Sequence, residues 1–202
     1  TQYRMHERVM GWSAETFYEG RLEAAGAVAR HRLVDLDGVT SNEWTEEPVC
    51  FVDTAGCGHE ETAERDEASR HNPGEAELVT RVVTDLVDAG LPLADIAVIT
   101  PYNAQVQRLR DRLPQTELEI GTVDGLQGRE KEAVVVSLVR SNDRSEVGFL
   151  AELRRMNVAL TRARRHLTVI GDSATLAGDH GLRALVDHLL AHACYRSAFE
   201  LA

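Results

Sequence analysis

The chain has 202 residues, of which 43% are hydrophobic and 27% are charged, and its formal net charge is −11. That length and apolar content suffice for one folded domain with a buried core. No apolar run approaches the ~20 residues of a membrane span, and the three cysteines show no disulfide or metal spacing, so neither a membrane protein nor a disulfide framework is expected.

From residue 49 onward, short apolar runs alternate with helical periodicities. Strands are predicted at residues 49–53, 96–100, 118–123, 133–139 and 166–171, and helices at 72–89, 102–113, 154–164 and 179–192. Because the strands are continuous apolar runs rather than alternating ones, the pattern is typical of an α/β fold, a mainly parallel sheet covered by helices on both faces. Residues 19–47 show no regular pattern and are expected to be irregular and packed on an edge.

The helix that begins at Asn72 carries the clearest end signals. Asn72 is the predicted N-cap, Pro73 stands at the first helical position, and Glu75 completes a capping box. Gly90 is expected to end the helix. The expected inward face consists of Leu78, Val79, Val82, Val83, Leu86 and Val87.

Three polar segments, residues 100–103, 122–128 and 140–142, each follow a predicted strand. Since the functional loops of a parallel α/β sheet lie at the carboxyl ends of its strands, we expect these segments to share one edge. Their hydroxyls, amides and backbone N–H groups suit contacts to phosphodiesters. For Thr122-Val123-Asp124-Gly125 a plain turn is the alternative, since Asp-Gly favours turns in general.

Residues 154–164 place four arginines in a chain that is otherwise strongly acidic. Their basic and apolar residues step by three and four, so the whole segment is predicted to be a helix. On such a helix Arg155 and Arg162 are two turns apart and project from nearly the same side. A planar guanidinium bonds two phosphate oxygens at once, which indicates phosphate chemistry. An ion-pair network or a solvated basic helix face is the alternative.

Four segments in order resemble the motifs of superfamily 1B helicases of the up-frameshift and immunoglobulin-mu-binding-protein type. They are Thr1-Gln2-Tyr3-Arg4-Met5-His6, Thr100-Pro101-Tyr102-Asn103-Ala104-Gln105, residues 122–132 (Thr-Val-Asp-Gly-Leu-Gln-Gly-Arg-Glu-Lys-Glu) and the arginine segment. Residues 52–58 and 139–142, between the motifs, resemble the immunoglobulin-mu-binding-protein type as well. Because the motifs recur in the family's order over residues 1 to about 175, the chain is identified as a member of it.

The resemblance implies a RecA-like three-layer domain over residues 1–202, the second, C-terminal motor domain of a longer enzyme. Arg4 and Arg162 match the two catalytic arginines that reach the γ-phosphate of ATP across the cleft between motor domains. Such an arginine stabilises charge on the transferred phosphoryl group. For Arg4 the alternative is a salt bridge to the acidic surface.

The resemblance also assigns nucleotide contacts around these arginines. Glu130 matches the carboxylate that meets the ribose, Gly128 would let the backbone approach closely, and Tyr3 matches the aromatic that stacks on the base. Gln2 is expected to contact the nucleotide or the adjacent domain. Ordinary packing is the alternative for Tyr3. In the related helicases the motifs after the strands touch the backbone of nucleic acid, a role carried over to Thr100, Pro101, Asn103 and Thr122, with Asp124 shaping the turn.

The chain has no G-x-x-x-x-G-K-[ST] sequence, and Lys131 is its only lysine. The family carries that loop in its first motor domain, where it binds phosphates and magnesium. We therefore expect ATP and Mg²⁺ to be bound mainly by an N-terminal RecA-like domain of the same parent chain. This chain would be the C-terminal fragment, inactive in isolation.

These features predict an ATP-dependent helicase that moves along single-stranded DNA or RNA; the motifs do not distinguish the two. One alternative is a nucleic-acid-stimulated ATPase that translocates without unwinding. Another is a catalytically inactive module that binds nucleic acid and regulates, which the intact set of Arg4, Glu130 and Arg162 disfavours.

The acidic charge disfavours tight nucleic-acid binding by this domain alone, although seven arginines gather in residues 140–166. A lysine-poor, acidic composition is typical of salt-adapted proteins and favours a halophilic prokaryote as the source, with a GC-rich genome as the alternative. A cytoplasmic monomer is expected. Neither Cys57-Gly58-His59 nor the group of His188, His192 and Cys194 is expected to bind zinc, because the first has only two ligands nearby and the second lies at a polar helix end.

Overall fold

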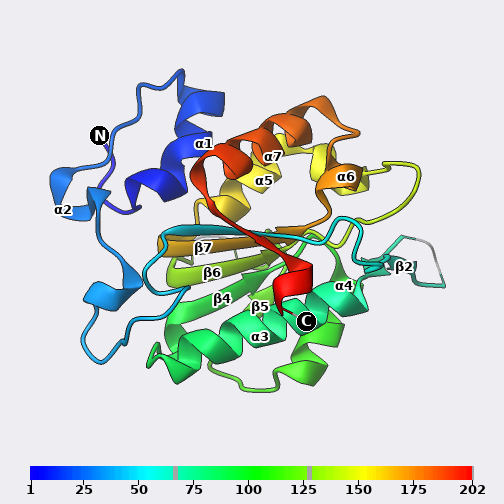
Figure 1. Ribbon diagram of the computed structural model, residues 1–202, viewed down its shortest axis with the longest axis horizontal. Helices are drawn as coiled ribbons and strands as arrows, with labels where there is room; N and C mark the ends of the chain where they lie inside the picture. Colours follow the sequence, from blue (N-terminus) through cyan, green and yellow to red (C-terminus); the bar gives the residue numbers. More distant parts are fainter. Residues whose placement is uncertain (66–67, 127–128, 202) are drawn as a thin grey trace.

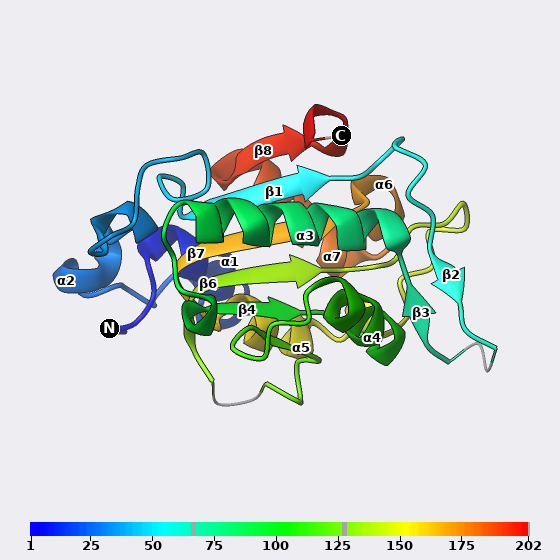
Figure 2. The ribbon, with the colours of Figure 1, turned by 90° about the horizontal axis from the view of Figure 1, so that it is seen from below.

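In the computed structural model, which describes residues 1–65, 68–126 and 129–201, a six-stranded sheet lies between two layers of helices (Figures 1 and 2). The strand order is β5-β4-β6-β7-β1-β8, and every neighbouring pair is parallel. The strands are β1 (Val49–Asp53), β4 (Ile96–Ile99), β5 (Glu119–Gly121), β6 (Lys131–Ser137), β7 (Ala163–Gly171) and β8 (Cys194–Ser197). The expected α/β class with a parallel sheet is confirmed.

Each face of the sheet has its own hydrophobic core. Helices α1 (Glu7–Tyr18), α5 (Leu153–Leu160), α6 (Ser173–Leu176) and α7 (His180–His192) cover one face, and α3 (Pro73–Asp88) and α4 (Asn103–Arg112) cover the other. Side chains of β1 alternate between the two cores: Val49 and Phe51 join the first, Cys50 and Val52 the second. Two buried faces explain why the strands are continuous apolar runs in the sequence.

Shorter elements complete the fold. Residues 62–71 hold a two-stranded antiparallel pair, β2 (Thr62–Ala63) and β3 (Arg70–His71). Helix α2 (Gly26–Ala29) and 3₁₀ turns at Leu33–Asp35, Leu93–Asp95, Gly148–Ala151 and Ala198–Leu201 lie in connections. No helix in the described ranges is both long enough and apolar enough to cross a membrane.

Helix α3 confirms most of its predicted end signals but not the capping box. The Asn72 side chain accepts a hydrogen bond from the Glu75 backbone, and Gly90, with φ of 100°, follows the last turn. The Glu75 carboxylate does not return to Asn72; it accepts hydrogen bonds from the Ser137 hydroxyl at 2.6 Å and the Val139 backbone at 2.8 Å. The Glu75 side chain therefore bonds to the end of β6 and to the turn after it rather than to the N-cap. The expected inward position of Val87 is also wrong, since its side chain is exposed.

Strand β6 ends at Ser137, two residues earlier than predicted, because the chain turns at Val139. Val139 has φ of 71°, a left-handed conformation that costs a β-branched residue energy. Two buried side chains of α3 hold it there: Glu75 accepts from its N–H, and Asn72 donates to its carbonyl at 3.1 Å.

The prediction of one helix over residues 154–164 is wrong. Helix α5 ends at Leu160, where Thr161 turns its hydroxyl back to the Asn157 carbonyl at 2.7 Å. Ala163 already pairs with Lys131 of β6, so the following residues belong to the central strand β7. At these residues the parallel ladder with β6 outweighs the helical periodicity of the segment. Arg162 therefore lies in a turn and Arg164 in a strand.

Residues 19–47 are largely irregular, as expected; Leu22 and Ala24 pack against the core on the α1 side, and the later residues of the segment pack on the α3 side. Leu33 and Trp44 are almost fully buried there, and the Trp44 indole donates to the Asp85 carboxylate at 3.0 Å. The edge strand β8 was not predicted. Its side chains are only half buried or exposed, so no apolar run marks it.

Candidate functional site

Arg4 and Glu130 form an ion pair beside the start of β7. Arg4 Nη1 lies 2.6 Å from Glu130 Oε1, and Arg4 Nη2 donates to the Thr161 carbonyl at 2.9 Å. Arg164 Nη2 lies 3.6 Å from the other Glu130 oxygen. The salt bridge expected as the alternative for Arg4 is therefore present in the structure. It fixes the direction in which the Arg4 guanidinium points.

Arg162 adds a second cation next to this pair. Its Nε donates to the Val158 carbonyl at 3.1 Å, and no ion pair with an acid is seen for it in the described part of the chain. Burial lowers the pKa of Arg162, the charge of Arg4 lowers it further, and Glu130 opposes both. Arg4 and Arg164 share the Glu130 carboxylate, and Arg162 adds a further guanidinium, which leaves net positive charge where an anion can bind.

Tyr3 and Gln2 flank Arg4 with different roles. The Tyr3 side chain is 77% exposed, so the packing alternative is wrong and the ring is free to stack. The Gln2 side-chain oxygen accepts from the backbones of Arg4 and Met5 at 2.8 and 2.7 Å, and its amide donates to the Met5 carbonyl. Gln2 therefore shapes the turn that presents Arg4. Gly128 lies outside the described residues.

The first two polar loops meet at one edge of the sheet, as predicted. Thr100 follows β4 and donates its backbone N–H to the Gly121 carbonyl of β5 at 3.1 Å. A cavity of about 140 Å³ lies between the loops and α5, lined among others by Thr100, Pro101, Thr122 and Asp124. The Thr100 hydroxyl is buried with no hydrogen-bond partner among the described residues, and a buried hydroxyl of this kind calls for one.

Within these loops Thr122 contacts the turn directly. The Thr122 hydroxyl accepts from the Gly125 backbone at 3.3 Å, whereas the Asp124 side chain is exposed and lies 3.7 Å from Arg155. The role of Asp124 in shaping the turn stays a prediction. Asn103 is exposed at the first residue of α4.

The third polar loop is not available for a ligand. Arg140 is 4% exposed and pairs with Glu61 at 2.8 Å, and the same Glu61 oxygen accepts from the Ser141 backbone and the Asn142 amide. The expectation that residues 140–142 contact phosphodiesters is therefore wrong. Glu61 comes 79 residues before Arg140 in an acidic loop, and no sequence signal marks it as the partner.

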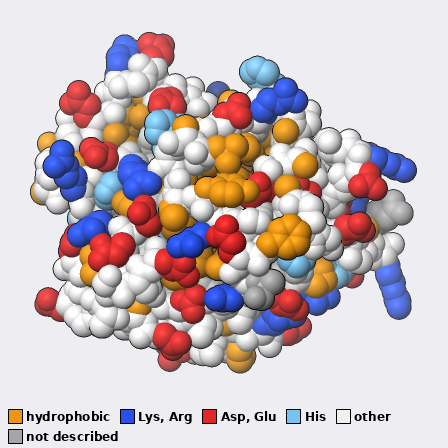
Figure 3. Space-filling view, in the orientation of Figure 1, with side chains coloured by type: hydrophobic (Ala, Val, Ile, Leu, Met, Phe, Trp, Pro, Cys, Tyr) orange, Lys and Arg blue, Asp and Glu red, His pale blue; other side chains and the backbone are white. Residues whose placement is uncertain are grey.

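The arginine segment serves two places rather than one. Arg155, on α5, lines the cavity beside Thr122, whereas Arg162, past the helix end, lies beside Arg4. The expectation that both project from the same side of one helix is wrong, because the helix ends at Leu160 and Arg162 lies in the turn that follows. Acids also partner most of the seven arginines of residues 140–166, and basic and acidic side chains are interspersed on the face in Figure 3.

Comparison with known proteins finds one domain family and several similar proteins, some of them named as helicases. The AAA domain family matches residues 1–174. The chain is 54% identical over 201 residues to the DNA-binding protein SMUBP-2 of Rattus norvegicus, covering 98% of this chain and 20% of that protein. It is 49% identical over 182 residues to the DNA polymerase alpha-associated DNA helicase A of Schizosaccharomyces pombe, covering 87% and 28%. An uncharacterized ATP-dependent helicase of Methanocaldococcus jannaschii is 40% identical over 186 residues, covering 88% and 27%. The chain thus spans about a fifth to a quarter of these relatives.

Proposed function

Because the chain belongs to the AAA domain family and resembles the C-terminal motor domains of superfamily 1B helicases throughout, we propose that residues 1–202 are such a motor domain. In this proposal the whole protein is an ATP-dependent helicase acting on single-stranded DNA or RNA. The domain completes the ATP site with Arg4 and Arg162 and holds the strand at the loops after β4 and β5. The names of the relatives, a DNA-binding protein and DNA helicases, support a DNA substrate.

The observation that carries the proposal is the juxtaposition of Arg4 and Arg162 around Glu130. The pair fits a triphosphate, because Glu130 is already shared by Arg4 and Arg164 and Arg162 pairs with no acid in the described ranges, so positive charge is left over. Bound ATP would supply the phosphoryl group that is transferred to water. Arg162 stabilises the negative charge that develops on that group, and Glu130 keeps Arg4 oriented. The exposed ring of Tyr3 offers a face to the adenine.

A partner domain is part of the proposal. The sequence has no phosphate-binding loop with lysine and hydroxyl, and Arg4 and Arg164 already hold the nearby carboxylate of Glu130. An N-terminal motor domain of the same polypeptide therefore holds the phosphates and Mg²⁺. The isolated chain supplies arginines to a site that it does not complete.

For the strand, the support is the cavity between the two loops. Thr100, Pro101, Thr122 and Asp124 line it together with Arg155. Asn103 lines a second cavity, which also includes Thr122. The Thr100 hydroxyl, which has no partner among the described residues, and the cationic Arg155 suit phosphate and sugar oxygens, which are the same in every sequence. Sequence-independent binding follows.

The test uses Arg162→Ala in the full-length protein, with Arg154→Ala as the matched control. Arg154 is exposed, belongs to the same motif and has no ion pair in the described ranges. We expect Arg162→Ala to lower kcat by about 10³ while the Kd for ATP changes little, and Arg154→Ala to retain turnover. Equal, small effects of the two substitutions would reject the arginine assignment.

A strand-displacement assay with partly duplex DNA and RNA then separates a helicase from an ATPase that only translocates. Displacement that depends on ATP hydrolysis supports the helicase. Strand-stimulated ATPase without displacement on either nucleic acid would replace it with the translocase.

A further inference from the structure

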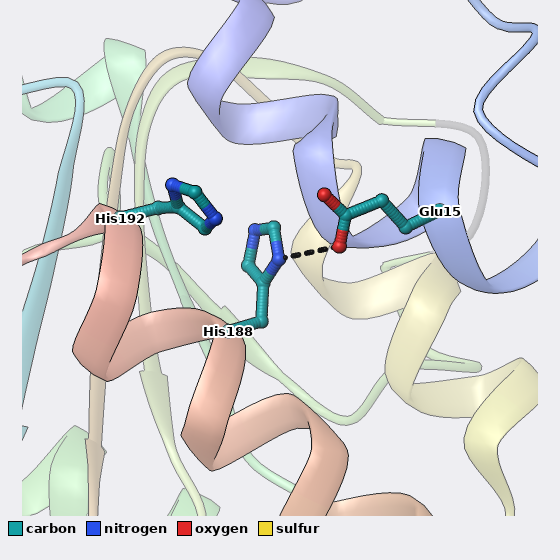
Figure 4. A group of neighbouring side chains, drawn as sticks. All are labelled: Glu15, His188 and His192. Atoms are coloured by element: carbon teal, nitrogen blue, oxygen red, sulfur yellow. Dashed lines mark hydrogen bonds and ion pairs between the residues drawn. The ribbon is translucent and has the colours of Figure 1, made fainter.

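Helices from opposite ends of the chain bring three potential metal ligands together (Figure 4). Glu15 lies on α1, and His188 and His192 lie on α7. One carboxylate oxygen and one nitrogen from each ring all lie within 4.8 Å of one another. His188 Nδ1 lies 2.9 Å from Glu15 Oε2. The ring centroids of His188 and His192 are 4.6 Å apart.

The packing of α1 against α7 builds this cluster. His188 and His192 are four residues apart on a helix and so share one face, and that face meets α1. Gly11 allows the close approach, because a Cβ at that position would lie 3.2 Å from His188 Nε2. Arg8 fixes the end of α7, since its Nε and Nη2 donate to the His192 carbonyl at 3.0 and 2.6 Å.

The charges around the cluster permit a cation. Glu15 contributes one negative charge that no basic side chain besides His188 neutralises in the described part of the protein. The nearest cation on α1, Arg8, is paired with Glu47 at 3.0 Å. A hydrogen bond between His188 and Glu15 alone would account for those two residues, but it would leave His192 beside them without a function.

We propose that Glu15, His188 and His192 bind a divalent transition-metal ion of the Zn²⁺ or Ni²⁺ type. Two imidazoles and a carboxylate are a ligand set that such ions take, whereas Mg²⁺ and Ca²⁺ prefer oxygen alone. Coordination at about 2 Å requires the ligand atoms to close in slightly. Glu15 and His192 are exposed and can rotate, while His188 is half buried and anchored. Water fills the remaining position.

Sequence reasoning grouped His188 and His192 with Cys194 and found no site. In the structure Cys194 is not part of the cluster, because it starts β8 and pairs in register with Cys50 of β1. Glu15, far away in the sequence, lies beside the two histidines instead. Bound metal would join α1 to α7 and so stabilise the folded chain by mass action. This inference does not depend on the proposed helicase activity.

The experiment measures Zn²⁺ binding to the 202-residue chain by competition with a chromophoric chelator, and thermal unfolding with and without Zn²⁺. The variants are His192→Ala and Glu15→Gln; the matched control is His180→Ala, which removes an exposed histidine from the same helix. We expect at least about 10-fold weaker binding in the first two variants and unchanged binding in the control. Zn²⁺ at about 100 times its Kd should raise Tm by about 5 °C in the wild type and control, and Mg²⁺ should not.

Cobalt distinguishes the ligands, because Co²⁺ bound to a thiolate gives an intense charge-transfer band that imidazole and carboxylate do not give. Weak d–d bands without that band support the cluster. Three results would overturn the proposal: Zn²⁺ binding that His192→Ala and Glu15→Gln leave unchanged, a thiolate band from Co²⁺, or no Zn²⁺ binding by the wild type. Unfolding curves without metal show that each variant is folded before binding is compared.

Discussion

The buried carboxyl of Glu75 allows a prediction on stability. Its side chain is fully buried between α3 and β6, and burial raises its pKa from 4.5 to about 8. Hydrogen bonds from Ser137 and Val139 oppose that rise, and the charges of Asp172 and Glu61 add to it. The folded chain therefore holds a proton on Glu75 at pH values where the unfolded chain has released it.

The sign of the effect follows from proton uptake. Between pH 4.5 and about 8 the folded state binds more protons at Glu75 than the unfolded state, so the free energy of unfolding falls as pH rises. Each pH unit costs about 1.4 kcal/mol, which makes the loss across the window on the order of 5 kcal/mol. Below pH 4.5 the penalty is absent.

Glu75→Gln removes this titration and keeps an acceptor for Ser137 and Val139. We expect the variant to gain stability relative to the wild type steadily from pH 5 to pH 8. Urea unfolding, followed by the fluorescence of the buried Trp12 and Trp44, measures the difference at each pH. Glu77→Gln, on the same helix but exposed, is the control and should run parallel to the wild type.

Two buried histidines change the stability in the opposite direction as pH rises. Their effect is the same in the wild type and in Glu75→Gln, so it cancels when the two are compared. Burial lowers the pKa of both His6 and His166 to about 4. Their neutral forms make the fold more stable as pH rises from 4 to 6.5, equally in wild type and variant. If the stability difference between Glu75→Gln and wild type stays constant from pH 5 to 8, Glu75 is charged in the fold and the reasoning fails.

Three further predictions concern the loops and the missing partner. Arg140→Ala should destabilise the chain by about 2–3 kcal/mol, because buried Glu61 loses one of its two arginine partners and keeps Arg70; in urea unfolding the exposed Arg144→Ala should cost less than about 0.5 kcal/mol, and equal costs would contradict this. Thr122→Val combined with Pro101→Ala should weaken strand binding and strand-stimulated ATPase in the full-length protein without loss of ATP binding, and cross-links from α7 to the strand would place the groove elsewhere. Phosphate release by the isolated chain should stay far below about 1 s⁻¹ with single strands present; turnover at that rate would show a complete ATP site.

The sequence alone determined the elements whose signal is local. Continuous apolar runs marked β1, β4 and β6, because strands buried on both faces need apolar residues at every position. Asn72, Pro73 and Gly90 marked the ends of α3 through short-range backbone chemistry. The resemblance of the motifs also assigned Arg4, Glu130 and Arg162 to one nucleotide site, before the structure showed their contacts.

Tertiary structure decided the features that depend on residues far apart in the chain. The parallel ladder with β6 makes residues 163–165 a strand rather than a helix, and the end of α5 at Leu160 separates Arg162 from Arg155. Glu61 forms an ion pair with Arg140, and Ser137 and Val139 donate hydrogen bonds to the Glu75 side chain. The packing of α1 against α7 places Glu15 beside His188 and His192. Periodicity and end signals report the preferences of neighbouring residues, whereas the partner of a buried or clustered polar group is set by packing that joins distant segments.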